Sequence, residues 1–158
     1  MNEVTINEEI TLKYRDGFDL MDDEELKKHF GVSGNNWGIY DRGQHTIISF
    51  AWNKVNGFMA WLADPNSVAN GIEKRMRDNL GGFERTSDVC INICGKKAEG
   101  FTFEYYVEDG NIKMVGKILS FRIGKCFYVI QFVTRAEREQ EANADFDAVI
   151  ASVALKGN

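Results

Sequence analysis

Cys126–Val133 reads CFYVIQFV, and this stretch decides the fold. Successive residues of a strand point to opposite faces of its sheet. Apart from Gln131, the residues on both faces of this stretch are apolar, which is typical of a strand that is covered on both sides. The stretch therefore predicts a central strand with other elements packed above and below its sheet.

The rest of the sheet is predicted from segments in which apolar and polar residues alternate. Short turns rich in Gly, Asp and Asn, such as Glu108–Asn111, separate several of these segments, so strands that follow one another are expected to be antiparallel. The predicted strands are Ile6–Arg15, Asn36–Arg42, His45–Asn53, Phe83–Cys94, Ala98–Val107 and Ile112–Ile123.

Two helices are predicted ahead of the last strands. Asp22 and Glu25 have the spacing of a capping box at the start of a short helix that ends at Phe30. Asp64 and Pro65 are a capping acid and a proline at the first helical position of a second helix. The apolar residues of that helix repeat every four positions: Val68, Ile72, Met76 and Leu80.

A final helix is predicted after the central strand, with Thr134 and Glu137 as the capping box at its start. Its apolar stripe has helical spacing and consists of Phe146, Val149, Ile150 and Val153. The chain, residues 1–158, is thus expected to form a single α+β domain. This domain is an α/β/α sandwich with a central six- or seven-stranded antiparallel sheet and helices on both faces.

Three segments resemble the Mog/PsbP-like superfamily: YRDGFDLM at Tyr14–Met21, FYVIQFVTRAE at Phe127–Glu137 and DFDAVIASV at Asp145–Val153. The resemblance covers nearly the whole chain in the order of its elements and implies an α/β/α sandwich. Members of the superfamily include a photosystem extrinsic subunit, a Ran-binding nuclear transport factor and chaperone-like proteins that handle secretion effectors. The matching segments are packing motifs, so the resemblance implies a fold and assigns no functional residue.

Composition and charge limit the expected partners. The chain has 24 acidic and 19 basic residues and a net charge of −5, and no basic run exceeds two residues, so nucleic acid is not an expected partner. No apolar run approaches the ~20 residues that a membrane span requires. The acidic N-terminus, MNEVTINEEI, and the odd number of cysteines favour the cytoplasm.

Cys90 and Cys94 lie in the stretch DVCINIC, which has the period of a strand. Four residues of strand span roughly 13 Å at ~3.3 Å per residue, too far for one disulfide or one tetrahedral metal site. Both cysteines are interpreted as strand residues, and no metal, cofactor or catalytic residue is predicted. One alternative stays open, in which Cys126 approaches His29 or His45 in space to form a dyad.

The connecting stretch Ala51–Asn66, AWNKVNGFMAWLADPN, is unusually rich in aromatic residues. One interpretation is an edge strand or a lid against the core. The other is an exposed patch that docks a partner peptide or another subunit. We therefore predict a non-catalytic binding or chaperone-like module, with homodimerisation as one form of binding, that uses Trp52, Phe58 and Trp61. The alternative is a small-ligand-binding protein or enzyme with a pocket between sheet and helix.

Overall fold

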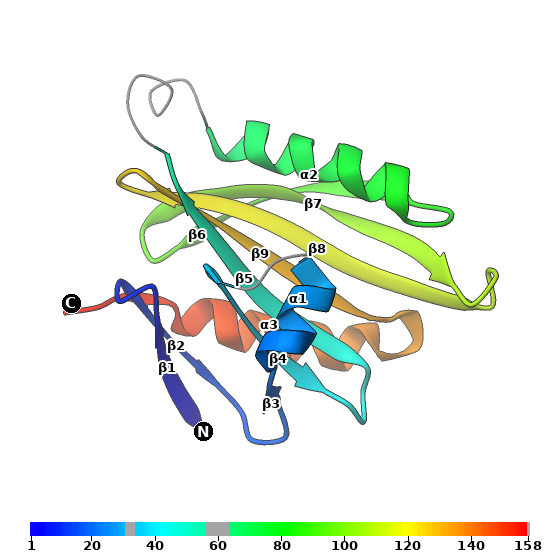
Figure 1. Cartoon of the computed structure of the whole chain (residues 1–158), viewed down its shortest axis with the longest axis horizontal. Helices are drawn as coiled ribbons and strands as arrows, with labels where there is room; N and C mark the ends of the chain where they lie inside the picture. The colour runs from blue at the N-terminus through cyan, green and yellow to red at the C-terminus, as the bar shows by residue number, and fades with distance from the viewer. Residues whose placement is uncertain (31–33, 56–63, 158) are drawn as a thin grey trace.

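The structure is a computed structural model that describes residues 1–30, 34–55 and 64–157. Within these residues the largest element is a seven-stranded antiparallel sheet with the order β3-β4-β5-β9-β8-β7-β6 (Figure 1). The strands of this sheet are β3 (Asp19–Leu20), β4 (Asn36–Asp41), β5 (Thr46–Lys54), β6 (Glu84–Ile93), β7 (Lys96–Val107), β8 (Ile112–Ile123) and β9 (Cys126–Arg135). The predicted α+β architecture is confirmed.

Strand β9 lies at the centre of the sheet, between β5 and β8, as CFYVIQFV predicts. Tyr128, Ile130 and Phe132 are fully buried on one face of the sheet. Phe127 and Val133 point to the other face and are also buried. The central strand therefore contributes to a core on each side of the sheet.

A second sheet, also composed of described residues, has the strand order β1-β2-β10: β1 (Asn2–Ile6), β2 (Ile10–Tyr14) and β10 (Ala154–Leu155). The single strand predicted over Ile6–Arg15 is therefore wrong at its start. Asn7 and Glu8 have φ of 51° and 53° and form the tight turn of a hairpin. The prediction missed this turn because it contains no glycine and because the apolar residues on either side of it fit one alternating pattern.

Helix α3 (Glu139–Ser152) lies on the same face of the large sheet as the three-stranded sheet (Figure 1). The ring of Phe146 stacks on that of Phe132 in β9, with ring centroids 4.9 Å apart. The predicted apolar stripe of this helix is confirmed, because all four of its members are buried: Phe146, Val149, Ile150 and Val153.

The predicted start of this last helix is wrong. Thr134 lies inside β9, where its hydroxyl is buried 3.0 Å from that of Thr46 in β5. A short 3₁₀ turn over Ala136–Arg138 separates the strand from α3. The capping-box spacing of Thr134 and Glu137 therefore occurs at the end of a strand, where the threonine serves a cross-strand contact.

Helix α2 (Pro65–Asn79) covers the opposite face of the large sheet from α3 (Figure 1). Helix α1 (Asp23–Phe30) lies on the same face of the sheet as α2. Its His29 contacts Ser49 of β5, and the residues before and after Ser49 point to the opposite face, into the core on the α3 side. The predicted N-caps of α1 and α2 are confirmed. The carboxylates of Asp22 and Asp64 each accept a hydrogen bond of 2.8 Å, from the backbone N–H groups of Glu25 and Ser67.

An ion triad joins the three-stranded sheet to the rest of the molecule. Arg15, which follows β2, donates to Asp41 at 2.6 Å and to Asp145 of α3 at 2.7 and 2.8 Å. These carboxylates, with Asp145 first, hold the pKa of the guanidinium above its usual value. No helix in the described ranges is both long and apolar enough to cross a membrane.

Candidate binding cavity between helix and sheet

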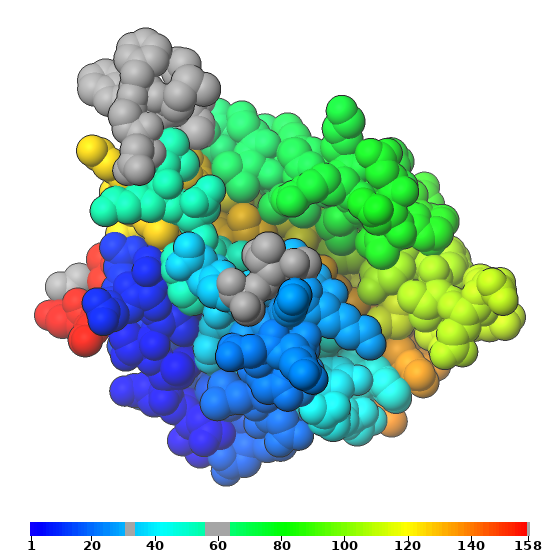
Figure 2. Space-filling view, in the orientation of Figure 1, coloured from blue at the N-terminus to red at the C-terminus, as the bar shows by residue number. Residues whose placement is uncertain are grey.

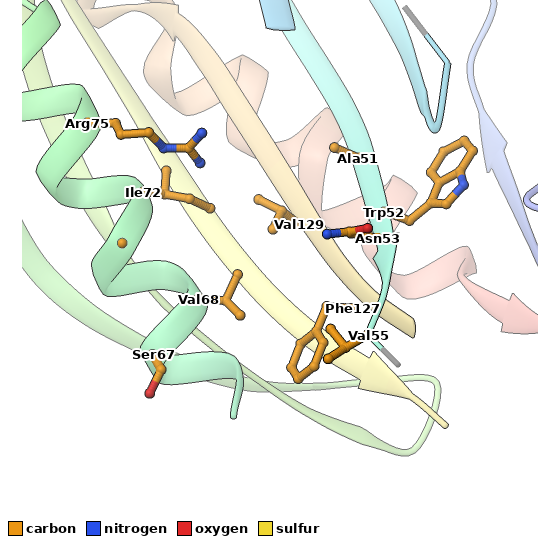
Figure 3. Close-up of a pocket in the computed structure, with 11 residues that line it drawn as sticks. Ala51, Trp52, Asn53, Val55, Ser67, Val68, Ile72, Arg75, Phe127 and Val129 are labelled. Carbon is orange, nitrogen blue, oxygen red and sulfur yellow. The ribbon is translucent and has the colours of Figure 1, made fainter. Parts of the chain in front are cut away.

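An open cavity of about 470 Å³ lies between α2 and the large sheet (Figure 3). The first half of α2 forms one wall with Val68 and Ile72, and β9 forms the facing wall with Phe127 and Val129. Ala51, near the end of β5, also lines the space. Side chains from three elements that are distant in sequence thus surround one apolar hollow.

The cavity exists because α2 lies off the centre of the sheet. The helix packs mainly on β7 and β8, so it covers β5 and β9 less completely. Ala51 and Val129 are paired across β5 and β9 and are only half-buried. Their neighbours Phe50 and Ile130, a pair on the other face of the same two strands, are fully buried. The hollow is therefore the part of this sheet face that the helix leaves uncovered.

The residues that flank the segment 56–63 lie beside this cavity. Val55, which directly follows β5, lines the cavity, and its backbone N–H donates to the carbonyl of Lys125 at 2.8 Å. Ser67, in the first turn of α2, also lines it. Residues on both sides of the segment 56–63 therefore line the cavity.

Arg75 of α2 is the one ionisable group among the described residues that line the cavity. Figure 3 shows its side chain extending from the helix beyond Ile72, toward the sheet. Within the described ranges no carboxylate lies within ion-pair distance of Arg75. By contrast, Arg77 and Arg85 both bind Glu73, at 2.8 and 2.6 Å. These hydrogen bonds, that of Arg77 first, lower the pKa of the Glu73 carboxyl.

A second hollow, of about 360 Å³, continues along the same face of β9. Gln131, Val133 and Arg135 line it, at the positions that follow Val129 on this face. In Figure 2 part of β9, in orange, is visible between α2 and β5. The two hollows together follow the length of the central strand.

His29 of α1 closes one side of this second hollow. Its Nε2 lies 3.2 Å from the hydroxyl of the buried Ser49, and burial lowers the pKa of the imidazole. The dyad that the sequence left open is not formed. His29 faces Ser49, His45 is exposed at the β4–β5 turn, and the thiol of Cys126 lies 3.6 Å from the side-chain amide of Asn7.

The predicted binding residues lie in and beyond β5. Trp52 is half-buried near the end of that strand, and in Figure 3 its ring points away from the cavity. The ring lies on the opposite face of the sheet, where its centroid is 6.4 Å from that of Tyr128. Phe58 and Trp61 lie outside the described residues. The sequence prediction did not include Arg75, because only the tertiary structure shows which arginines are paired.

All three cysteines are unpaired: Cys90 is exposed, Cys94 is half-buried and Cys126 is buried. Strand β6 ends at Ile93, and Cys94 has a φ of 45° in the turn that follows, so the interpretation as a strand residue is confirmed for Cys90 and wrong for Cys94. In the described part of the chain, no group of three or more His, Cys, Asp or Glu residues could hold a metal ion.

No protein-family model matches the chain, and no curated protein matches its sequence. The structure is similar to cyanobacterial PsbP (CyanoP) from Synechocystis sp. PCC 6803, with a TM-score of 0.65 and 14% identity over 98% of this chain and 91% of that chain. It is also similar to LpqN of Mycobacterium tuberculosis, described as involved in cell envelope biogenesis, with a TM-score of 0.63 and 15% identity over 92% and 82%. A third similar structure is the Ran-binding protein Mog1p of Saccharomyces cerevisiae, with a TM-score of 0.61 and 11% identity over 98% and 94%. Such likenesses carry the fold and no function. The chain therefore has the Mog/PsbP-like fold that its sequence segments resemble.

Proposed function

We propose that the protein is a non-catalytic binding module that docks a protein or peptide at the mouth of the cavity between α2 and the sheet. The observation that carries this proposal is the composition of the cavity walls. Val68, Ile72 and Val129 are half-buried apolar residues, and the described lining adds one cation, Arg75. A concave apolar surface with few polar groups is the usual composition of a binding site.

Of the predicted residues Trp52, Phe58 and Trp61, the last two are proposed to contact a partner at the cavity, because the Trp52 ring points to the opposite face of the sheet (Figure 3). The connection that contains Phe58 and Trp61 starts and ends beside the cavity, at Val55 and Ser67. Tryptophan and other large aromatic residues are typical hot spots, because each buries a large area at a small cost in conformational entropy. A partner seated over the cavity would therefore be within reach of this connection.

The class of partner is proposed to be a protein or peptide, with a second copy of the chain as the alternative. One structure of the same fold is named a Ran-binding protein, so this fold can serve protein recognition. The cytoplasm is proposed as the compartment, because an odd number of cysteines is unusual in secreted proteins.

The test is a comparison of partner binding by wild type, Trp61→Ala and a matched aromatic control. Tyr106→Ala is that control, because Tyr106 is 38% exposed on β7, a strand that does not line the cavity. A partner recovered with wild-type protein should bind Trp61→Ala roughly thirtyfold more weakly and Tyr106→Ala equally well. Equal binding by all three proteins would refute the proposal. Sedimentation at several concentrations identifies a second copy of the chain as the partner.

A small-ligand-binding protein is the second candidate function. The cavity volume of about 470 Å³ lies within the ~300–1,000 Å³ of ordinary ligand sites, and the cavity lies between sheet and helix as this alternative requires. Its described lining supports the binding of an apolar ligand more directly than acid–base catalysis, which requires positioned titratable groups.

A further inference from the structure

We infer that the cavity between α2 and the sheet binds an elongated apolar molecule that carries one carboxylate, and that Arg75 pairs with that carboxylate. This inference rests on the small-ligand function proposed above and names its ligand class. It is independent of the docking role of Trp61, so the two can fail separately.

The charge of the ligand is argued from how the neighbouring arginines are paired. Arg77 on the same helix and Arg85 on β6 share the carboxylate of Glu73. Arg75 has no such partner in the described parts of the chain, and it lies at the wall of an apolar cavity. A guanidinium is always charged, and its planar pair of N–H donors matches the two oxygens of a carboxylate. The unpaired cation is thus complementary to an anionic ligand group.

The apolar body of the ligand is argued from the cavity walls. Val68 and Ile72 face Phe127 and Val129 across the space (Figure 3). Gly71 lies between the two helix residues and adds no side chain, and a Cβ built there meets no atom within 4 Å. These walls would remove an alkyl or aromatic body from water, which is favourable at about 25 cal/mol per Å² of buried apolar surface.

The elongated shape is argued from the spacing of the polar groups that α2 contributes to a lining that also includes the polar Asn53 of β5. Arg75 and Ser67 both line the cavity from α2 and lie eight residues apart in the sequence. At 1.5 Å per residue this spacing is about 12 Å along the helix axis. Apolar side chains occupy the positions between them that face the sheet, so the ligand should present its carboxylate at one end and an apolar chain along the rest.

Decanoate is the probe, and decanamide, which has the same chain without the charge, is the matched neutral probe. Wild-type protein should bind decanoate at least tenfold more tightly than decanamide in calorimetric titration, because a hydrogen-bonded ion pair adds to the apolar contact. Arg75→Met keeps an apolar stem of similar length and should lose this preference while it still binds decanamide. Arg77→Met is the control on the same helix and should keep the preference.

A second variant tests whether the probes occupy this cavity. Gly71→Leu adds a side chain at the cavity wall where there is open space, and leucine is the better helix former, so the fold should be retained. Both probes should bind this variant at least tenfold more weakly. Equal wild-type affinity for the two probes, equal effects of Arg75→Met and Arg77→Met, or unchanged binding by Gly71→Leu would each overturn the inference. None of these outcomes bears on partner binding by Trp61→Ala, which tests the docking function by itself.

Discussion

The two faces of β5 and β9 differ although their residues alternate along the same two strands. On the α3 face, Phe50 and Ile130 are fully buried, and α3 and the three-stranded sheet close over them. On the α2 face, Ala51, which follows Phe50, and Val129, which precedes Ile130, are half-buried and line the cavity. The difference teaches that β5 and β9 are covered completely on the α3 face and only in part on the α2 face, although the sheet has a core on each side.

The two faces differ because the helices and strands that cover them differ in how much of the sheet they cover. The α3 face is covered by a helix and a second sheet, and Arg15 ties that second sheet to Asp41 and Asp145. On the other face α2 packs mainly on β7 and β8, and α1 covers part of β4 and β5. A space therefore stays open between the two helices over the central strand. Mutations on the two faces should have different effects on stability.

The largest expected effect is that of Phe146→Ala on the closed face. The ring is 2% exposed and stacks on Phe132, so its removal leaves a cavity that the surrounding core fills only in part. The free energy of unfolding should fall by about 3–5 kcal/mol, which is a large share of the stability of an ordinary domain. Denaturant unfolding followed by circular dichroism measures this change. A loss below about 1 kcal/mol would show that the closed face is not the main core.

A smaller effect is expected from Ile72→Ala on the open face. Ile72 is half-buried beside an existing cavity, so the substitution removes fewer contacts than at a fully buried site. The expected loss is below about 2 kcal/mol. The matched variant is Ile48→Ala in β5, where the same residue type is 0% exposed on the closed face, and it should lose about 2–5 kcal/mol. The comparison fails if Ile72→Ala is the more damaging of the two in the same unfolding assay.

The closed face could be predicted from sequence because local patterns specify it. CFYVIQFV has apolar residues at every position that points to the α3 face, and the spacing of Phe146 and Val149 fits one stripe of a helix. The predictions from local sequence patterns were wrong where contacts with distant parts of the chain determine the structure. The hairpin turn uses Asn7 and Glu8 at positive φ without a glycine, and Thr134 is a strand residue that contacts Thr46.

The open face could not be predicted because it depends on where a helix lies across the sheet. The sequence predicts the cap and the apolar stripe of α2, and both are present. Nothing in the stripe indicates that the helix packs on β7 and β8 and leaves β9 partly uncovered. The i,i+4 spacing of Glu73 and Arg77 indicates their pairing, but the sequence does not show that Arg85 reaches the same carboxylate. Nor does it show that Arg75 has no carboxylate partner among the described residues.

A pH-dependent effect is expected at His29, on the open face. Burial lowers the pKa of this imidazole in the folded state below the ordinary value of about 6.5, which the unfolded chain keeps. Well above pH 6.5 the histidine is neutral in both states and does not change stability with pH. As the pH falls below 6.5 the unfolded state binds the proton first, so stability is lost until the pH reaches the folded-state pKa.

Unfolding midpoints between pH 7.5 and pH 5 measure this loss in wild type, His29→Gln and His45→Gln. The glutamine at position 29 can still hydrogen-bond the hydroxyl of Ser49 but does not titrate, so the loss of stability on acidification should be smaller. His45 is exposed at the β4–β5 turn, and His45→Gln is the control for the loss of an imidazole away from Ser49. Equal slopes for wild type and His29→Gln would show that the imidazole takes up its proton equally well in both states.

The smallest expected effect is that of a thiol reductant or a chelator, which should leave the melting temperature unchanged. The closed face includes Cys126, whose thiol is unpaired and whose pKa is raised by burial, so it stays protonated and is a poor metal ligand. Cys90 and Cys94 are also unpaired. If packing alone holds this face, neither dithiothreitol nor EDTA removes anything that the folded state needs. Thermal unfolding with and without each reagent checks this, with Cys126→Ser as a variant that lacks the buried thiol. A clear drop in the melting temperature of the wild type, absent in Cys126→Ser, would show that this cysteine forms a bond or binds a metal that stabilises the closed face.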